Sequence, residues 1–571
     1  MKFKPQRMVA WYDVRQLART GVKTVVSSIF GNFADKRELQ AVLSEATPVD
    51  YTAQEDLWVD FISDLGDGFN ATYTMASLMA QEQLKVGDHV LQRGKILIMG
   101  GDEVYPTPEK EHYENRLQGP YEAAFPKNAD QTADERPHLF AIPGNHDWYD
   151  GLTNFIKLFC QERSLGNWQT RQKRSYFALK LAHDVWIWGI DVQLNADIDY
   201  PQLCYFGEIT DKMPEGSKVI LCTAEPGWIY QGVPAEENAY KRLEFFKNKF
   251  FKGGNATLLA TLSGDMHHYA RYAATDDKGR EYNQLITAGG GGAFTHPTHF
   301  LADNVVIGPH ITAQLKKTYP DKGTSSMMAF GNLLFPFLNW QMPLTFGLLH
   351  LFTSWFLQST TKYRKAEGGQ SFMELLAGYE LSFHNLGRIL DIMHYALSHN
   401  PAVVLLNLLL AASIAAFTDT TYGKGKLNWI AGGLHTLLQV VNFYLLIWVI
   451  SRINLQMLEL PLESGQQITL FTLEMVIGGG LVSGLIFGLY LLASTLLFKA
   501  HPTEAFSSMR LTRYKNFLRM HITKESVRIY PIGVRKVVSD WKNISENEEK
   551  PEFKGSEIDC ELIEEPIVIH Y

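Results

Sequence analysis

The stretch TLLATLSGDMHHY, residues 257–269, changes character at its middle. Its first seven residues are an apolar run of strand length, and Gly264, Asp265, His267 and His268 follow almost at once. A short apolar run bounded by turn residues is typical of a buried strand. In open α/β sheets the ligand crevice lies beyond the carboxyl ends of the strands, so this polar loop stands where chemistry is expected.

The same pattern recurs across residues 55–290. Short β-branched and aromatic runs alternate with helix-like stretches, and most runs are followed directly by Gly, Asp, Asn or His. This alternation predicts a layered α/β domain. For any single loop, a simpler interpretation is that Gly and Asp only make the turn. The runs are LWVDFIS (57–63), KILIMG (95–100), HLFAIPG (138–144), SYFALKL (175–181), VWIWGID (185–191), KVILCTA (218–224), TLLATLS (257–263) and NQLITAG (283–289).

Length, charge and cysteine spacing exclude several classes of protein. A chain of 571 residues is long enough for several domains. A net charge of −8 and a pI near 6.2 argue against nucleic acid as the main partner. The four cysteines are far apart and form no C-x-x-C pair, so neither a zinc knuckle nor a disulfide framework is expected. The first twenty residues lack the apolar core of a secretory signal, so we expect the N-terminal part in the cytoplasm.

The last third of the chain is strongly apolar. Four stretches, 334–357, 401–418, 430–451 and 475–498, are near the length of about 20 residues that crosses a bilayer as a helix. Between them, the amphipathic segment 371–397 is expected to lie along the interface. Four spans would return the C-terminus to the side of the N-terminus. We therefore expect a multi-pass protein of the cell membrane with its catalytic domain in the cytoplasm.

Basic residues near the expected spans agree with this orientation only in part. A cytoplasmic position suits Lys424, Lys426, Arg510, Arg513, Lys515 and Arg519, but not Lys362, Arg364 and Lys365. The expected domains are an N-terminal helical segment (1–50), an α/β domain (51–325), a transmembrane domain of about four helices (326–500) and a cytoplasmic tail domain (501–571).

Two polar or small-residue patterns lie inside the apolar part. Glycines repeat every four residues at Gly480, Gly484 and Gly488, which predicts close helix packing. Polar groups at membrane depth, His435, Gln439 and Asn442, either form part of a pathway or bond to neighbouring helices. We favour bonds between helices because no acidic or basic residue joins the three.

Five loops carry the residues suited to chemistry: SDLGDGFNATY (63–73), GGDEVYP (100–106), PGNHDWYDG (143–151), TAEPGW (223–228) and SGDMHHY (263–269). In the third loop, Asn145 offers a neutral oxygen to a metal, His146 can donate a proton, and Asp147 can orient the imidazole. The carboxylate of Asp102 has enough lone pairs to bridge two cations. Two metals about 3.5 to 4 Å apart can hold a hydroxide and neutralise the phosphoryl oxygens of an in-line displacement.

These loops resemble the calcineurin-like metallophosphoesterases, whose pattern is D-x-H, G-D-x-x, G-N-H-D or G-N-H-E, a lone His, and G-H-x-H. The resemblance implies a sandwich of two packed sheets flanked by helices. It also implies that Asp64, Asp102, Asn145 and His267 bind metal, and that His146 is the histidine that acts in the transition state.

Three positions depart from that pattern. Gly66 replaces the histidine of D-x-H, Ala224 replaces the lone His, and Asp265 replaces the first His of G-H-x-H. A carboxylate stands at or beside each lost imidazole, which adds Asp67, Glu225 and Asp265 to the candidate metal ligands. One or two divalent ions are expected, and so many oxygens favour manganese, iron or magnesium over zinc. Alternatively, Asp67 and Glu225 only bind loop amides or form a salt bridge.

The resemblance narrows to a membrane-anchored subfamily of plants and bacteria. It rests on SDLGDGFNATY, IPGNHDWYDGL, KRSYFAL, GDMHHYARY, GGGGAFTHPTH and EAFSSMRLTRYKNFLRMHI, which together reach through nearly the whole chain. That subfamily also has Asp at position 265, and its fourth motif usually reads T-H-E-P, where this chain has Ala224 in place of the imidazole.

The glycine-rich stretch GGGGAFTHPTH, 289–299, has two interpretations. Four glycines allow backbone amides to approach an anion, and His296 and His299, with the earlier His268, are then candidates for binding substrate. Glycine runs at strand ends are also ordinary loops.

These observations predict an integral membrane phosphoesterase that hydrolyses a phosphate ester by attack of a metal-bound hydroxide. A catalytic domain tethered by helices suits a substrate held at the bilayer, such as a phosphodiester or a lipid-linked molecule. The alternative is a protein without catalysis that binds a metal or a nucleotide at a degraded site. A third possibility is a phosphomonoesterase that acts on soluble substrates.

Overall fold

The computed structural model describes residues 3–30, 37, 40, 47–192, 198–230, 237–308, 311–360, 369–380, 382–419, 425–547 and 551–571. The chain divides into two compact units. We call Met1–Val9, Ala18–Ser326 and Arg510–Tyr571 the sandwich unit, and Ala10–Leu17 and Met327–Met509 the helical unit. The basic residues Lys362, Arg364, Lys365 and Lys424 lie outside the described residues.

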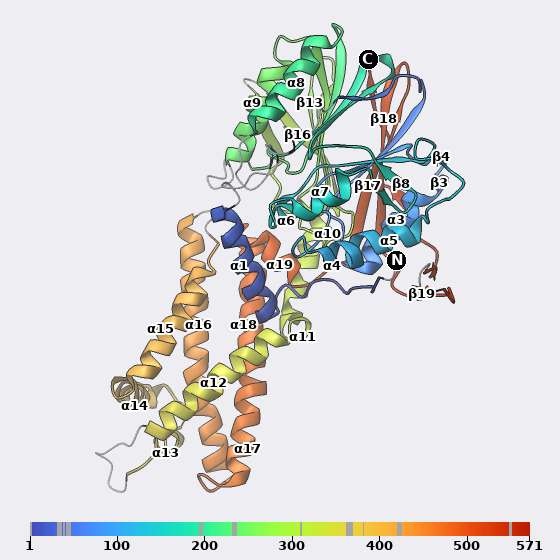
Figure 1. The fold of residues 1–571 in the computed structure, drawn as a ribbon. Coiled ribbons are helices and arrows are strands. Elements are labelled where there is room, and N and C mark those ends of the chain that lie inside the picture. Colours follow the sequence, from blue (N-terminus) through green and yellow to red (C-terminus); the bar gives the residue numbers. More distant parts are fainter. Residues whose placement is uncertain are drawn as a thin grey trace. The chain divides into compact units, whose positions relative to one another are not determined.

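Two large sheets form the sandwich unit (Figure 1). In sheet I, β10, β11, β12 and β14 run parallel, so their carboxyl ends meet at one edge. Its order is β1 (Val49–Tyr51), β9 (Phe177–Leu181), β10 (Val185–Ile190), β11 (Ser217–Thr223), β12 (Ala256–Ser263), β14 (Glu281–Ala288), β13 (Tyr269–Thr275), β16 (Ile311–Tyr319) and β15 (Asn304–Gly308).

Sheet II has a parallel centre, in which β5 lies between β2 and β6. Its order is β21 (Glu561–Leu562), β18 (Ser526–Lys536), β17 (Arg513–Ile522), β2 (Leu57–Ile62), β5 (Ile96–Met99), β6 (His138–Ala141), β8 (Trp168–Thr170) and β7 (Ser164–Leu165), and β22 (Ile567–His570) pairs with β18. Two small hairpins join β3 (Gln83–Val86) to β4 (His89–Gln92) and β19 (Lys542–Asn543) to β20 (Phe553–Lys554).

Side-chain alternation along the strands builds three apolar layers. In β5, Ile96 and Ile98 pack between the two sheets, whereas Leu97 and Met99 face the other way. Helices cover the outer face of sheet II: α3 (Phe69–Ala80), η2 (Tyr113–Gln118), α5 (Gly119–Ala124) and α7 (Thr153–Phe159). The outer face of sheet I is covered by α8 (Tyr200–Lys212) and α9 (Glu237–Phe251) (Figure 1). The predicted mixed α/β double sheet flanked by helices is confirmed.

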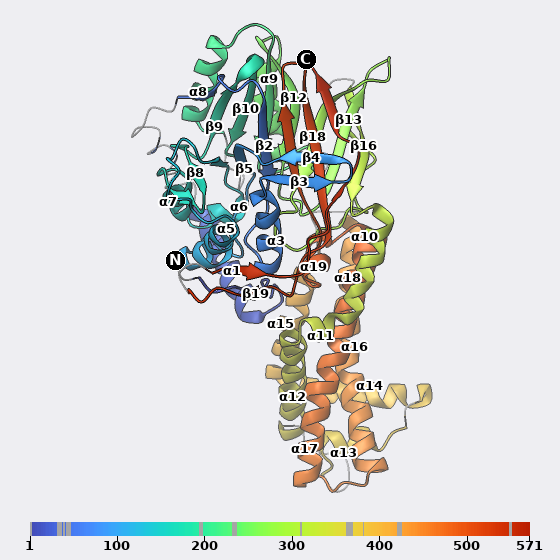
Figure 2. The ribbon, with the colours of Figure 1, turned by 90° about the vertical axis from the view of Figure 1, so that its right-hand side faces the viewer.

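The tail of the chain belongs to the sandwich unit. β17 pairs with β2 along five residues, from Leu518 opposite Phe61 to Ile522 opposite Leu57. The strands of the tail, drawn in red, therefore run among the blue and green strands in Figure 2. Residues 510–571 are therefore part of the sandwich unit and do not form the separate tail domain that was expected over 501–571. The helical unit is an insertion in the chain between β16 and β17. Two of the basic residues read as cytoplasmic markers, Lys515 and Arg519, are fully buried inside this sheet.

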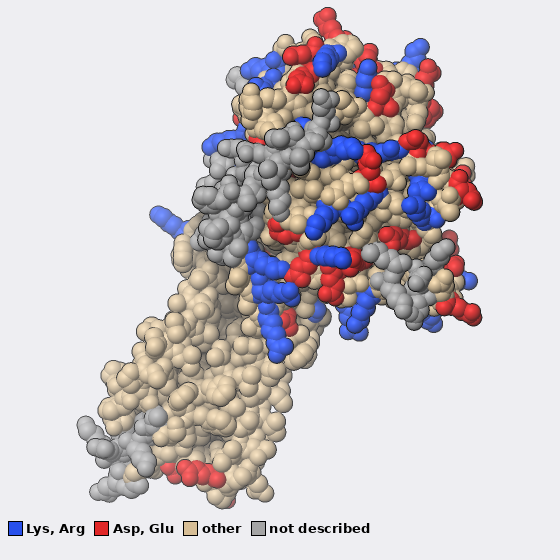
Figure 3. All heavy atoms as spheres, viewed as in Figure 1, with Lys and Arg blue, Asp and Glu red and all other residues tan. Residues whose placement is uncertain are grey.

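Helices make up the described part of the other unit, whose visible face is almost free of charged side chains (Figure 3). They are α11 (Phe335–Leu338), α12 (Gln341–Thr360), α13 (Phe372–Ala377), α14 (Leu386–Ser398), α15 (Pro401–Ala416), α16 (Gly425–Arg452), α17 (Gly465–Leu473), α18 (Gly480–Ala493) and α19 (Pro502–Ser507), joined in places by short 3-10 or π-helical turns. Helix α1 (Val14–Phe30) begins in this unit and continues into the other.

Of the described helices, two are long and apolar enough to cross a membrane: Gly425–Met457 and Gly465–Phe498. A third span exists only if the pair Phe383–Ser398 and Pro401–Ala416, bent by 103°, counts as one. The expected stretch 334–357 is broken at Asn339, between α11 and α12. The 16 residues of α15 measure about 24 Å, short of a hydrocarbon core of about 30 Å.

Polar side chains inside this unit bond one helix to another. The side chain of Gln439 donates to the carbonyl of Ser483 at 3.0 Å, and Asn442 donates to the Ser483 hydroxyl at 3.2 Å. His350 meets the same hydroxyl at 2.8 Å. The favoured interpretation, bonds between helices, is confirmed for Gln439 and Asn442. Close packing of the glycine face is confirmed too, because a Cβ on Gly480 would lie 2.4 Å from a backbone oxygen of α12.

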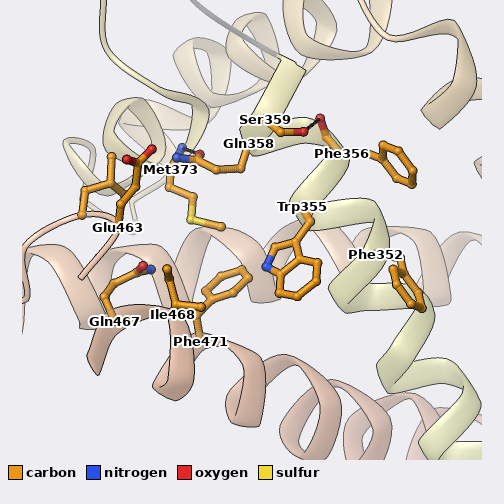
Figure 4. Close-up of a pocket in the computed structure, with 11 residues that line it drawn as sticks. Phe352, Trp355, Phe356, Gln358, Ser359, Met373, Glu463, Gln467, Ile468 and Phe471 are labelled. Carbon is orange, nitrogen blue, oxygen red and sulfur yellow. Dashed lines mark hydrogen bonds between the residues drawn. The ribbon is translucent and has the colours of Figure 1, made fainter. Parts of the chain in front are cut away.

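One pocket of about 490 Å³ lies within the helical unit, between α12, α17 and the start of α13 (Figure 4). The rings of Phe352, Trp355 and Phe471 form much of its wall, and Gln358, Glu463 and Gln467 supply polar groups. Its lining includes none of the predicted site residues.

Candidate functional site

Three acidic residues follow the ends of three strands with the same unusual backbone. Asp64 follows β2 with φ 60°, Asp102 follows β5 with φ 52°, and Asp265 follows β12 with φ 68°. Aspartate tolerates this left-handed conformation better than most side chains, but it remains uncommon. Such conformations cluster at functional sites, where the surrounding structure holds them in place.

The hydroxyl of Tyr105 joins residues from both sheets. It lies 3.0 Å from Asp64 Oδ1, 3.1 Å from Asp102 Oδ2 and 2.9 Å from His267 Nε2. All four side chains are buried. Three of the predicted ligands, far apart in sequence, therefore meet at one point. Tyr105 itself was missed, although it stands three residues after Asp102 in GGDEVYP and a phenol oxygen is a hard donor.

His267 is held with a defined ring orientation. Its Nδ1 lies 2.8 Å from the carbonyl oxygen of Phe294, an acceptor only, so Nδ1 carries the hydrogen and donates it. The other nitrogen, Nε2, then has a lone pair directed toward Tyr105 and Asp64, the latter at 3.4 Å. A carbonyl that fixes the tautomer in this way is typical of a histidine that binds metal.

One hydrogen therefore serves three acceptors at this point. When both carboxyls are ionised, the Tyr105 O–H can donate to only one of Asp64, Asp102 and His267 at a time, and the other two contacts join lone pairs to lone pairs. Burial raises the pKa of both carboxyls, and the charge of Asp64 raises that of Asp102 further. A cation would satisfy the surplus of acceptors and offset the burial of two carboxylates.

Asn145 and His146 begin the short helix α6 (Asn145–Trp148) after β6. The backbone N–H of His146 donates to Asp102 Oδ1 at 2.9 Å, which places this turn against the same carboxylate. The buried Oδ1 of Asn145 has no hydrogen-bond partner among the described residues. An orphaned amide oxygen on the residue that precedes His146 fits the expected role of Asn145 as a neutral metal ligand.

Asp147 does not orient the imidazole as expected. Its carboxylate accepts from the backbone N–H groups of Gly144, at 2.9 Å, and Glu103, at 3.1 Å, and from the Tyr113 hydroxyl. The imidazole of His146 is instead held through Nδ1 by the carbonyl of Pro106 at 2.9 Å. Asp147 is a helix-capping residue that fixes the loop. Burial lowers the pKa of His146 to about 4, so its ring is neutral near pH 7.

Asp265 stands beside Asp64. Its backbone N–H donates to Asp64 Oδ2 at 3.0 Å, and its own carboxylate accepts from the Tyr230 hydroxyl. The carboxylate that replaces a histidine is thus in the site, with a tyrosine as its neighbour.

Asp67 and Glu225 each have a contact of the kind that the alternative interpretation describes. The buried Oδ2 of Asp67 has no hydrogen-bond partner among the described residues, so both residues stay candidate ligands. Asp67 accepts the backbone N–H of Val9 at 2.8 Å, and its own carbonyl accepts from Arg116. Glu225 pairs with Arg242 at 3.8 Å. At Gly66, an added Cβ would lie 2.7 Å from a backbone oxygen, so the structure has no room there for a histidine.

Part of the glycine-rich loop is packed against the site. The N–H groups of Gly289, Gly291 and Ala293 donate to the carbonyls of His268, Ser63 and Asp64. An added Cβ on Gly289 would lie 2.6 Å from Asp64 Oδ2. These amides are therefore occupied, and the ordinary-loop interpretation holds for them.

The three histidines expected to bind substrate have different surroundings. His268 is fully buried. His296 stacks on His267, with ring centroids 4.0 Å apart. His299 bonds through Nδ1 to the Ser325 hydroxyl at 2.9 Å. His296 is thus the one that touches a predicted metal ligand.

Within the described ranges, no group of three or more His, Cys, Asp or Glu side chains is arranged to hold a metal ion by itself. The Tyr105 hydroxyl stands at the point where Asp64, Asp102 and His267 converge, and it spaces them at hydrogen-bond distances. Counted with Tyr105 and the orphaned oxygen of Asn145, the donor set is rich in oxygen and fits a hard divalent cation.

No family model matches the chain, and no curated protein matches it. Among solved structures, purple acid phosphatase PPD1 from yellow lupin (Lupinus luteus) seeds aligns at 11% identity with a TM-score of 0.31, over 46% of this chain and 48% of that one. A structure of PhoD aligns at 11% identity with a TM-score of 0.27, over 48% of this chain and 70% of that one. The aligned part thus spans about half the length of the lupin enzyme.

Proposed function

We propose that this protein is a membrane-anchored, metal-dependent phosphoesterase. One observation carries the proposal: the single hydroxyl of Tyr105 faces Asp64, Asp102 and His267, which come from strand ends in both sheets. Acceptor atoms that outnumber their donors, buried at the carboxyl ends of strands, are suited to a cation.

Asp64, Asp102, Asn145, His267 and Tyr105 would hold the metal, with Asp265 beside them. Manganese, iron or magnesium suits these donors better than zinc. When bound, such an ion supplies an acidified water and neutralises charge on phosphoryl oxygens. The two buried carboxyls then stay ionised, because a cation opposes the effect of burial.

His146 is the residue proposed to act on the substrate. The Pro106 carbonyl fixes the hydrogen on Nδ1, and the bond from its own N–H to Asp102 fixes its backbone. An anionic phosphate near the ring would raise the pKa of His146 from its low value, because an opposite charge favours the protonated form. The protonated ring could then give a proton to the leaving oxygen. Asp147 contributes by holding the loop.

The substrate proposed is a phosphodiester or a lipid-linked phosphate ester. The two long apolar helices support a position at a membrane, where such a substrate lies at headgroup depth. A cytoplasmic catalytic unit and a multi-pass arrangement are parts of the same proposal.

The test uses the full-length protein, because β17 from the tail completes sheet II. Metal content is measured after purification, and hydrolysis of a chromogenic phosphodiester and of the matching monoester is followed with added manganese. Asp102→Asn should abolish the phosphodiesterase activity, and Asp211→Asn, at an exposed position on α8, should leave it unchanged. If D102N hydrolyses the diester at the wild-type rate, the proposal is wrong.

The same assays separate the alternatives. A protein that binds metal or a nucleotide without catalysis would bind manganese and turn over neither substrate. Preference for the soluble monoester would support a phosphomonoesterase.

A further inference from the structure

The start of β17 and the residues just before it contact the glycine-rich loop. The N–H of Thr295 donates to the Leu511 carbonyl at 2.9 Å, and the N–H of Asn516 donates to the Gly290 carbonyl at 3.1 Å. The Thr295 hydroxyl reaches Leu511 O at 3.1 Å and also the Arg513 carbonyl. Residues 511–516 thus hold residues 290–295.

Lys515 is the charged member of this contact. Its side chain is fully buried, with an exposure of 0%. The ammonium donates to the Ala293 carbonyl and to the Thr295 hydroxyl, the latter at 3.3 Å. Burial of an ammonium is costly unless its hydrogens are bonded and an acid is near. Asp67 is the acid whose charge most favours Lys515, and Asp64 follows.

The loop that Lys515 holds also positions two of the proposed metal ligands. The Phe294 carbonyl accepts from His267 Nδ1 at 2.8 Å, and the N–H of His296 donates to the His267 carbonyl at 3.2 Å. The N–H of Ala293 donates to the Asp64 carbonyl at 2.9 Å. Lys515 bonds the residue on one side of Phe294 and the residue on the other. A shift of this loop would therefore turn the imidazole.

We infer that Lys515 is a positioning residue for the metal site, which acts through residues 293–296 to hold His267 and Asp64. The inference rests on the proposed function. The ammonium is fully buried, and its printed hydrogen bonds go to Ala293 and Thr295 of this loop. The inference also makes β17, the strand that follows the helical unit, a support of the proposed metal site.

Three variants of the full-length protein test this role. Lys515→Met removes the ammonium and keeps an apolar chain of similar length. Thr295→Val keeps the side-chain shape and removes the hydroxyl that bonds Lys515 and the carbonyls of Leu511 and Arg513. Lys536→Met is the matched control, because Lys536 is exposed at the end of β18 in the same hairpin. Each variant is compared with wild type for manganese affinity by calorimetry, for hydrogen exchange in residues 289–296, and for hydrolysis of the chromogenic phosphodiester.

We expect K515M to bind manganese about 10- to 100-fold more weakly, the usual cost of losing a group that supports a metal ligand. Exchange should speed up at residues 293–296, T295V should show a smaller change in the same direction, and K536M should match wild type. Lys515→Arg, which keeps the charge and the donors, should recover part of the manganese affinity.

Wild-type manganese affinity and wild-type exchange in K515M would overturn the inference. If K515M does not fold, T295V decides: unchanged exchange at residues 293–296 in that variant overturns it as well. Absence of phosphoester hydrolysis in the wild-type protein would refute the proposed function alone, because manganese affinity and loop exchange still report on Lys515.

Discussion

Replacing Arg519 with methionine should destabilise the sandwich unit far more than the substitution of an exposed residue in the same sheet. Arg519 Nε and Nη2 meet Asp60 Oδ1 and Oδ2 at 2.7 and 2.9 Å, and this pair joins β17 to β2. The two side chains are 0% and 3% exposed. Removing one partner of a buried ion pair costs about 3 to 5 kcal/mol, because the other charge stays buried without compensation.

A double-mutant cycle separates this explanation from simple loss of packing. R519M leaves the Asp60 carboxylate stranded, whereas R519M combined with Asp60→Asn has no stranded charge, and Asn can still accept the N–H that Gly94 donates to Asp60 at 3.2 Å. The double variant should therefore recover most of the lost stability.

The assay is urea unfolding of the full-length protein in detergent, followed by tryptophan fluorescence. The matched control is Arg535→Met, which removes an exposed arginine bonded to Glu561 at 2.6 Å in the same sheet and should not shift the midpoint measurably. The reasoning fails if R519M unfolds within about 0.5 kcal/mol of wild type, the range of ordinary surface substitutions, or if the double variant is as unstable as R519M.

Three further predictions concern other parts of the sandwich unit. Tyr105→Phe keeps the ring and removes the shared hydroxyl, so manganese affinity should fall about 10- to 100-fold in calorimetry; unchanged affinity would exclude the hydroxyl from the site. Burial, with a smaller effect of Arg171, lowers the pKa of His138 to about 4, below its ordinary value of 6.5. The neutral ring therefore stabilises the fold above pH 6.5, and this contribution is lost as the pH falls from 6.5 to 4. His138→Gln should reduce the drop in the urea midpoint that acid causes. An identical drop in the variant would contradict the lowered pKa of His138. Residues 1–326 expressed alone should be insoluble, because β2 would become an exposed edge of the sheet. A chain in which a long Gly/Ser linker replaces residues 327–509 should be soluble, because it keeps β17. If residues 1–326 alone are soluble and folded, this prediction is wrong.

The central strands of the fold could be predicted because their signal is local. An apolar run with a polar residue directly after it marks β2, β5, β6 and β12, and each was expected from such a run. The place of β17 could not be predicted in the same way. Its partner β2 lies more than 450 residues earlier in the chain, and no local pattern shows which strand will lie beside it. For the same reason Lys515 and Arg519 looked like surface charges next to a membrane span.

Some side-chain roles in the site could be predicted from the sequence, and others depend on where the side chain lies in the fold. Convergence of strand ends marked the loops that contain Asp64 and Asp102, and the resemblance to metallophosphoesterases singled out these two residues as ligands. Asp147 was misassigned, since adjacency to His146 in sequence does not tell that its carboxylate turns back to cap the helix. Tyr105 was missed because its importance depends on where its hydroxyl ends, six bonds from the backbone, and sequence spacing does not give that position.

The insertion of the helical unit between β16 and β17 has a consequence for how the chain folds. One side of β2 in sheet II has no partner strand until synthesis has passed the helical unit, because β17 comes after it. The same late segment supplies Lys515 and the backbone groups that hold the glycine-rich loop. Contacts between residues so distant in sequence form slowly, because the loop-closure entropy must be paid before they contribute. The proposed metal site would therefore be completed only after both apolar helices have been made, and a chain that stops short of residue 510 would lack the groups that hold residues 290–295.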